Sequence, residues 1–281
     1  MMESLKLGDK MLKTEKLTYL YEDGTLALKD IDIDLSKGSR IGIIGENGSG
    51  KSTLFLNLIG ILKPNKGKVL FNSNSLKYSK KYLREYRKKV NIVFQDPDRQ
   101  IFYSNIYDDV AFALRNLGYD EKEVSNKVEN ALERVGAIDF KEKPIHFLSH
   151  GQKKRIAIAS VLAMDGDIIL FDEPTSGLDP SMTRAMINTL KDISEEKTIV
   201  ISSHNMDLIY ELCDYVYVLS EGEVIGNGLV EEVFCNEKVI KKAGLNQPWL
   251  VKVHRKLNIP LFKHEEEFFN YWKENIQEGD Y

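Results

Sequence analysis

The feature that most constrains this chain is a glycine-rich loop at residues 45–52, which reads Gly-Glu-Asn-Gly-Ser-Gly-Lys-Ser. The loop fits the pattern Gly-x-x-x-x-Gly-Lys-Ser/Thr and lies between an apolar run at residues 40–44 and a helical pattern. In that context the glycines let backbone N–H groups converge on phosphate oxygens, and the helix directs its positive N-terminal end to the same anion. A glycine-rich turn without a ligand is the alternative, but chance matches seldom have both the strand and the helix. The loop therefore predicts a phosphate-binding site.

Two side chains at the end of this loop are expected to act on the bound phosphates. Lys51 would reach the β- and γ-phosphates of a nucleotide. The Ser52 hydroxyl supplies a hard oxygen ligand of the kind that Mg²⁺ prefers. The pair therefore predicts a nucleoside triphosphate bound together with Mg²⁺.

Two adjacent carboxylates, Asp172 and Glu173, follow a second apolar run at residues 168–171. The carboxyl end of a parallel strand is where α/β folds bind their ligands. Asp172 is placed to hold Mg²⁺ or its waters, and Glu173 to face an attacking water as base or water-positioner. An acidic cap of an ordinary strand is the alternative, and it is the weaker one beside a phosphate-binding loop. The turn at residues 176–179 precedes a helix that we expect to begin around Ser181.

The hydrophobic pattern predicts an α/β fold. Short β-branched runs at residues 40–44, 90–94, 168–171 and 198–202 alternate with helical patterns, which favours a parallel sheet flanked by helices. Residues 12–19 and 31–35, joined by a turn-like stretch at 22–24, predict an antiparallel subsheet. Residues 105–135 are helical and charged and predict a helical subdomain. After Gly228 a polar, aromatic tail predicts a small second unit.

Composition narrows the classes of function. A net charge of −4 and a pI near 5.9 leave no basic excess, so we expect no nucleic-acid partner. Cys213 and Cys235 have neither metal-ligand nor disulfide spacing and are expected to be free thiols. The N-terminus has no apolar signal region, and no apolar run reaches the roughly 18 residues needed to cross a bilayer. A role at a membrane would therefore depend on a partner.

The order of motifs resembles the nucleotide-binding subunit of ABC transporters over about residues 12–235. Gln95 follows the strand at 90–94, residues 148–152 read Leu-Ser-His-Gly-Gln, and His204 follows the strand at 198–202. The signature segment, residues 148–152, departs from the usual Leu-Ser-Gly-Gly-Gln because His150 replaces a glycine. Similar substitution is familiar in the cobalt importer branch of the family, so we expect the fold and function to be retained.

The resemblance implies an ATPase with ATP and Mg²⁺ and a head-to-tail dimer in which each ATP lies between one P-loop and the other subunit's signature segment. Catalytic roles would fall to Glu173, His204, Lys51 and Gln95. The residues expected to contact nucleotide are Tyr21, Gly45, Glu46, Asn47, Gly48, Ser49, Gly50, Lys51, Ser52, Thr53, Ser149, Gly151, Gln152 and Asp179; the metal ligands are Ser52, Gln95 and Asp172. For Tyr21 strand packing is the alternative to stacking on adenine, and for His204 it is a capped histidine without chemistry.

Residues 95–102 and 107–112 resemble the ATPases of energy-coupling-factor importers, the CbiO-like cobalt and nickel group and its vitamin-importing relatives. The resemblance implies three partners: a second ABC ATPase subunit in a homo- or heterodimer, a transmembrane coupling protein docking near Gln95, and a membrane substrate-binding protein. The chain would then lie at the cytoplasmic face of the membrane. Vitamin import, or a soluble non-transport ABC ATPase, is the alternative; a P-loop protein that only binds nucleotide would lack Glu173.

The expected architecture is therefore a P-loop ABC ATPase core at residues 1–235, with an antiparallel β-subdomain and a helical subdomain at about residues 96–165. A small C-terminal extension would follow at residues 236–281.

Overall fold

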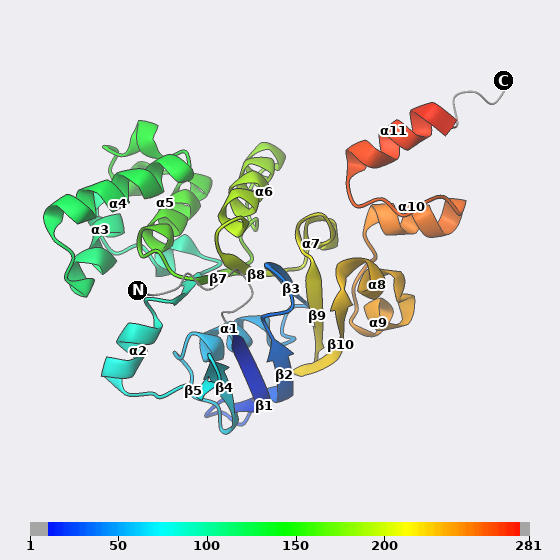
Figure 1. Cartoon of the computed structure of the whole chain (residues 1–281), viewed down its shortest axis with the longest axis horizontal. Helices are drawn as coiled ribbons and strands as arrows, with labels where there is room; N and C mark the ends of the chain where they lie inside the picture. Colours follow the sequence, from blue (N-terminus) through cyan, green and yellow to red (C-terminus); the bar gives the residue numbers. More distant parts are fainter. Residues whose placement is uncertain (1–10, 276–281) are drawn as a thin grey trace, which may run out of the picture.

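The computed structural model describes residues 11–275, which form two β-sheets with helices packed against them (Figure 1). The smaller sheet is antiparallel, has the order β2-β1-β4-β5, and consists of β1 (Leu12–Leu20), β2 (Leu26–Asp34), β4 (Lys66–Phe71) and β5 (Asn74–Ser75). The larger sheet has the order β10-β9-β3-β8-β7-β6 and consists of β3 (Arg40–Ile44), β6 (Val90–Val93), β7 (Ile168–Asp172), β8 (Thr198–Ser203), β9 (Tyr215–Ser220) and β10 (Glu223–Leu229). Its strands pair in parallel except for β10, which is antiparallel to β9.

The four buried runs that predict a parallel sheet are confirmed as β3, β6, β7 and β8, each ending within a residue of the predicted end. The predicted strand at residues 31–35 was too short, because β2 begins at Leu26. Leu26 is 49% exposed on this edge strand, so its hydrophobicity does not mark a buried face. Strand β4 was not predicted; Val69 is its only buried side chain, and a single apolar position makes no period.

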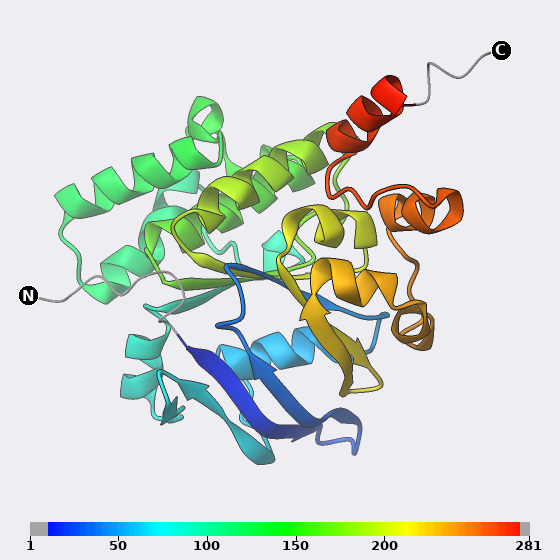
Figure 2. The same cartoon turned by 45° about the vertical axis from the view of Figure 1, so that its right-hand side comes forward.

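The helices cover both faces of the larger sheet. In chain order they are α1 (Lys51–Leu58), α2 (Lys80–Tyr86), α3 (Ile106–Leu117), α4 (Glu121–Arg134), α5 (His150–Ala163), α6 (Pro180–Ser194), α7 (Met206–Leu212), α8 (Val230–Cys235), α9 (Glu237–Lys242), α10 (Trp249–Leu257) and α11 (Glu265–Asn275). Short 3-10 segments are η1 (Pro97–Arg99), η2 (Ile138–Phe140) and η3 (Ile145–Phe147). Figure 2 shows α6 and α7 on one face of the larger sheet, with α1 and the smaller sheet on the other.

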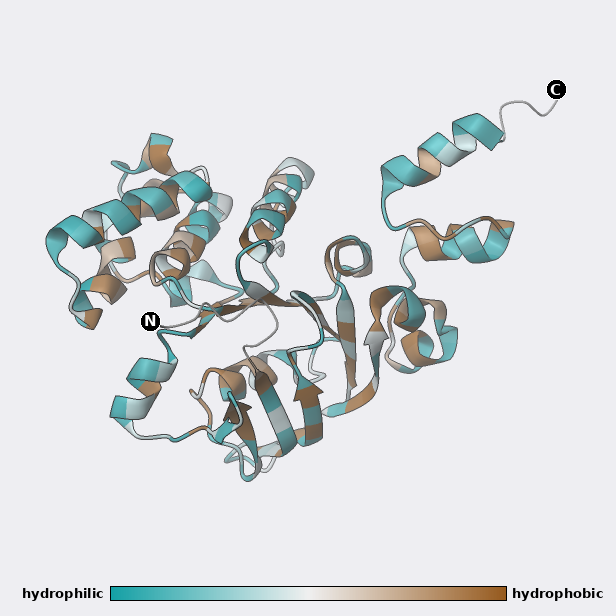
Figure 3. Ribbon diagram, viewed as in Figure 1, coloured by the Kyte–Doolittle hydropathy of each residue, from teal (hydrophilic) through white to brown (hydrophobic). Residues whose placement is uncertain are grey.

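Two hydrophobic cores follow from this layering. One lies between the two sheets around α1, with Leu54, Phe55 and Leu58 fully buried there. The other lies on the opposite face and runs from α3, α4 and α5 through α6 and α7 to the C-terminal helices. The strands of the larger sheet are mostly hydrophobic in Figure 3, whereas α4 and α11 carry hydrophilic residues along most of their length. A sheet covered on both faces requires apolar residues on both sides of its strands.

The charged stretch after β6 forms α3 and α4, which pack on α5. Helix α3 begins at Asn105, whose side chain accepts a hydrogen bond from Asp108 N, and ends at Gly118 in the left-handed conformation. Helix α4 begins with a capping box in which the side chains of Asp120 and Glu123 each accept a hydrogen bond from the other's backbone N–H. These caps fix where the helices start, and their apolar faces join the larger core.

The C-terminal helices pack on α7 rather than standing apart. Trp249 N donates to Asp207 Oδ1 at 2.7 Å, and the Tyr210 hydroxyl donates to Phe262 O at 3.1 Å. Phe268 is buried against Trp249, with ring centroids 5.5 Å apart. The described part of the tail thus shares the larger core; residues 1–10 and 276–281 lie outside the described residues. Cys213 and Cys235 are free thiols, as predicted.

Candidate active site

The glycine-rich loop connects β3 to α1 and surrounds the ammonium group of Lys51. Lys51 is buried, and its Nζ donates to Gly45 O at 2.7 Å and to Glu46 O at 2.9 Å. Gly50 has φ +105, and a Cβ there would lie 2.7 Å from Ala27 O, so only glycine fits. Burial lowers the pKa of Lys51, while the carboxylates of Glu173 and Asp172 oppose that shift. The loop thus holds a cation beside two acids.

The acidic pair lies at the carboxyl end of β7, next to the end of β8. Ser202 Oγ donates to Asp172 Oδ1 at 2.5 Å, and Glu173 N donates to both Ser202 O and Ser202 Oγ at 3.1 Å. Glu173 has φ +49, a left-handed conformation that is uncommon outside glycine. Its Oε2 lies 2.9 Å from His204 Nδ1, and the side chains of Glu173 and His204 are 7% and 61% exposed. The pair joins a buried carboxylate to an imidazole that faces solvent. Sequence reasoning assigned no role to Ser202, since it marks only a strand end.

One cavity of about 650 Å³ brings most of the expected residues together. It is lined by Tyr21, Thr25, Leu26, Ala27, Asn47, Gly48, Gly50, Lys51, Ser52, Thr53, Gln95, Asp172, Glu173, Ser176 and His204. The Tyr21 hydroxyl lies 3.0 Å from Thr53 Oγ1, which fixes the ring at the edge of the cavity. Thr25, Leu26 and Ala27 were not predicted to line this cavity, because they belong to no motif and follow an ordinary turn.

Ser52, Gln95 and Asp172 also line an adjoining cavity of about 240 Å³. Their side chains offer a hydroxyl, an amide and a carboxylate oxygen, all hard donors of the kind that Mg²⁺ takes. The donor set therefore fits Mg²⁺.

Other expected residues lie elsewhere in the chain. Ser149 caps α5 through a reciprocal pair of hydrogen bonds with Gln152, and Asp179 caps α6 by accepting from Met182 N at 2.8 Å. Gly151 packs on α6, where an added Cβ would lie 2.6 Å from Met182 Sδ. The nucleotide cavity is lined by neither the signature segment nor Asp179. The side chain of Glu46 also points elsewhere, because it lies against Gly244 of the C-terminal extension.

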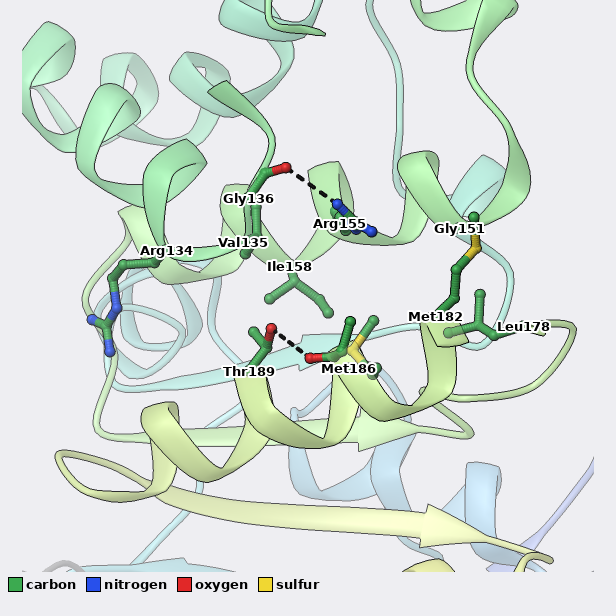
Figure 4. A pocket seen from close by; sticks show the side chains of 11 residues that line it. Arg134, Val135, Gly136, Gly151, Arg155, Ile158, Leu178, Met182, Met186 and Thr189 are labelled. Atoms are coloured by element: carbon green, nitrogen blue, oxygen red, sulfur yellow. Dashed lines mark hydrogen bonds between the residues drawn. The ribbon is translucent and has the colours of Figure 1, made fainter. Parts of the chain in front are cut away.

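Figure 4 shows the surroundings of Gly151 in a cavity of about 190 Å³ between α4, α5 and α6. Met182 and Leu178 lie beside Gly151, and Ile158 and Met186 face one another across the cavity. The His150 ring lies near Gly177, because a Cβ added to Gly177 would be 3.4 Å from the ring. The unusual histidine of the signature segment is thus directed at the turn before α6.

An apolar groove of about 250 Å³ lies between the β6 side of the sheet and the helices α3 and α5. Phe94, Gln100, Phe102 and Phe112 are among its lining residues. Phe102 is 74% exposed, and Asp109 Oδ1 accepts from Phe102 N at 2.8 Å, which fixes the backbone that presents this ring. Its lining residue Phe94 directly precedes Gln95 in the sequence.

A glycine-rich loop with its lysine, a carboxylate pair and a histidine in one cavity on an α/β sheet define a P-loop nucleoside triphosphatase. A family model described as "ABC transporter" matches residues 28–176. The chain belongs to the ABC transporter family and is an ATP-binding, ATP-hydrolysing subunit of it.

Two relatives are similar over most of their length. The cobalt import ATP-binding protein CbiO of Salmonella paratyphi A is 48% identical over 261 residues, which cover 92% of this chain and 96% of that protein. The energy-coupling factor transporter ATP-binding protein EcfA of Methanosphaera stadtmanae is 45% identical over 249 residues, covering 88% and 90%.

Solved structures agree. CbiO1 from Clostridium perfringens, described as part of the ABC transporter complex CbiONQ, superposes with a TM-score of 0.75 at 43% identity, over 89% of this chain and 96% of that one. The dimeric ATP-binding cassette MJ0796, bound to ADP and Pi, has a TM-score of 0.70 at 26% identity, over 78% and 99%. These neighbours confirm the predicted fold class. Within residues 11–275 no helix is both long and apolar enough to cross a membrane.

Proposed function

We propose that ATP hydrolysis by this chain energises a membrane importer of the energy-coupling-factor type, with cobalt or a related transition metal ion as the cargo. The observation that carries the hydrolytic part is the Glu173–His204 pair, which faces Lys51 and Ser52 in one cavity. The similarity to a CbiO protein named for cobalt import supports the choice of cargo. Cargo recognition would belong to a membrane partner. Vitamin import is the alternative cargo that the resemblance implies.

The P-loop residues bind the phosphates. The N-terminal end of α1 and the loop N–H groups of Gly48 and Gly50 offer hydrogen bonds to an anion. Lys51 exchanges its two loop carbonyls for phosphate oxygens, which are better partners because they carry charge. Lys51 therefore changes its hydrogen-bond partners when a triphosphate binds.

Glu173 and His204 act on the attacking water. The carboxylate of Glu173 accepts a proton from the water or orients it, and His204 holds Glu173 Oε2 in place. Such chemistry needs little more than alignment and charge stabilisation, since phosphoryl transfer demands little covalent work from the protein. The buried position of Glu173 limits how far it can turn.

The hydroxyl of Ser52, the carboxylate of Asp172 and the amide oxygen of Gln95 would hold Mg²⁺. When bound, the ion supplies charge neutralisation on the β- and γ-phosphates. Ser202 keeps Asp172 oriented through its 2.5 Å hydrogen bond.

The second half of each nucleotide site would come from a second ABC ATPase subunit. Ser149, Gly151, Gln152 and Asp179 stand away from the chain's own nucleotide cavity. They lie at the starts of α5 and α6, where helix dipoles offer positive potential to a partner's nucleotide. Dimeric MJ0796 supports this arrangement by similarity.

The apolar groove beside Gln95 would receive a helix of a transmembrane coupling protein. Its exposed phenylalanines, Phe102 and Phe112, suit an apolar helix face. Gln100, which also lines the groove, donates a hydrogen bond to the backbone carbonyl of Ala157 and so links the groove to α5. CbiO1 is described as part of the ABC transporter complex CbiONQ, which supports a partner of this kind. The chain would thereby be held at the cytoplasmic face of the membrane.

Uptake of radiolabelled cobalt by the native host tests the proposal. We expect deletion of this chain to abolish uptake, the wild-type chain to restore it, and Glu173→Gln, which should still fold and bind ATP, to leave it abolished. Unchanged cobalt uptake in the deletion strain would contradict the metal cargo. Vitamin uptake is measured in the same strains, and its loss in the deletion strain would identify a vitamin as the cargo.

A further inference from the structure

Lys154 is a buried lysine whose three N–H donors all bind backbone carbonyls. It lies on α5, two residues after the signature segment, and is 2% exposed. Its Nζ donates to Glu173 O and Pro174 O at 3.1 Å and to Ser176 O at 2.6 Å. Within residues 11–275 no carboxylate lies within ion-pair distance of it. All three hydrogen bonds of the ammonium group therefore go to the loop at residues 173–176.

That loop has a backbone that needs support. Glu173 adopts φ +49, a conformation that non-glycine residues keep only when their surroundings restrain them. Ser202 restrains its N–H group, and Lys154 restrains its carbonyl. The Glu173 carboxylate reaches His204 from this fixed backbone. Glu173 O also accepts from Ser176 N at 3.1 Å. A side chain at 154 without N–H donors would therefore remove one of two donors to Glu173 O, take away the Lys154 bonds to the carbonyls of Pro174 and Ser176, and let the loop relax.

The charge of Lys154 also bears on this loop. Burial lowers its pKa to about 8, and the carboxylates of Glu173 and Asp96 act in the opposite direction. A buried cation is costly unless its hydrogen bonds are complete, and here they are. An apolar residue would fill the same space at less cost, so packing alone does not account for a lysine.

We propose that Lys154 is a positioning residue that fixes Glu173 of its own subunit from the signature helix α5. Because α5 also carries the segment that meets the partner's nucleotide, hydrolysis at one site would then depend on the helix that closes the other site. This inference rests on the roles proposed above for Glu173 and for the signature segment.

Steady-state ATP turnover of the purified chain tests the inference with Lys154→Met, Lys154→Gln and Glu173→Gln. We expect Lys154→Met to lower kcat about 10- to 100-fold while KM for ATP stays within about threefold, because misplaced catalytic groups cost rate rather than binding. Lys154→Gln keeps two N–H donors and should recover part of kcat. Lys122→Met, on the exposed surface of α4, is the matched control and should leave turnover unchanged.

The outcomes distinguish an error in the role of Glu173 from an error in the role of Lys154. If Glu173→Gln retains full turnover, the role of Glu173 is wrong and the inference about Lys154 falls with it. If Glu173→Gln loses turnover but Lys154→Met keeps kcat within twofold, only the inference is overturned. A rise in KM that accounts for the whole loss overturns it too. If Lys154→Met does not fold, Lys154→Gln decides, with a lowered kcat at unchanged KM in support and an unchanged kcat against.

A mixed dimer shows which chain the effect follows. One copy carries Lys51→Ala, so that the other copy supplies the only active P-loop and Glu173. We expect Lys154→Met in the active copy to lower turnover about 10- to 100-fold, and in the Lys51→Ala copy to lower it less than about threefold. A loss that follows the Lys51→Ala copy would show that Lys154 acts through the signature contact, and an equal loss from either copy would show that it does not act on Glu173 of its own subunit alone; either result would overturn the inference.

Discussion

Two loops meet in the nucleotide cavity, and they are held in opposite ways. The P-loop is shaped mainly by its own residues, since Lys51 bonds the carbonyls of Gly45 and Glu46, and from outside Gly222 N donates to Ser49 O. The loop after Asp172 is held by residues far away in the sequence: Lys154 on α5, and Ser202 at the end of β8. The P-loop can be recognised from its sequence because its own residues largely determine its shape. For the loop after Asp172, the sequence shows which chemical groups are present but not the distant residues that hold them. Changing each loop in turn tests whether this difference matters for catalysis.

The largest effect is expected at the externally held loop. Glu173→Gln keeps the shape of the side chain but removes the base, so turnover should fall about 1000-fold while ATP affinity stays near that of the wild type. Phosphate release and equilibrium ATP binding measure the two quantities. Near-normal turnover would remove Glu173 from its role.

The next effect is expected at the P-loop. Lys51→Ala removes the cation that exchanges carbonyls for phosphate oxygens, so ATP should bind about 100-fold more weakly, equivalent to about 2.7 kcal/mol. Titration with ATP checks this, with Lys63→Ala, a lysine outside the nucleotide cavity, as control. Unchanged affinity would show that the backbone N–H groups bind the phosphates without it.

A smaller effect is expected from Ser202→Ala. Ser202 Oγ donates to Asp172 and accepts from Glu173 N, so its loss removes the bond to Asp172 and one of the two acceptors of Glu173 N. Turnover should fall about 10-fold and the free energy of unfolding by about 1–3 kcal/mol. Urea unfolding and ATP turnover of the same preparation test both. A loss of stability without a loss of turnover would mean that the outside supports serve the fold alone.

The last effect concerns pH, and it changes stability without changing turnover. Because folding lowers the pKa of Lys154 from 10.5 to about 8, the unfolded chain binds more protons between those values. The free energy of unfolding should therefore gain up to about 1.4 kcal/mol per pH unit from this group as pH rises from 8 toward 10. Lys154→Met lacks the contribution, so urea unfolding of both proteins along this range should show a shallower rise for the variant. Parallel curves would show that folding does not lower the pKa of Lys154.

The sequence predicts what contiguous residues determine. The P-loop, its strand β3 and the parallel strands were predictable because buried runs and the glycine pattern are local. The start of β2 at Leu26 was not, because exposed edge residues carry no period. Within the site, Glu173 and His204 were predictable as residue types in motif order, but their 2.9 Å pairing and the left-handed backbone of Glu173 were not. The burial of Lys154 depends on α5 packing against a loop from another strand, which neither segment reveals alone.

The left-handed backbone at Glu173 has an evolutionary consequence. Glycine would adopt φ +49 without strain, so the position that carries the reaction is one where a substitution that abolishes activity would relieve the backbone. Stability and activity are in conflict at this single site. A lineage released from selection for hydrolysis would gain by losing the carboxylate early. Among duplicated copies of such a subunit, the residue at this position is therefore a sensitive record of whether hydrolysis is still under selection.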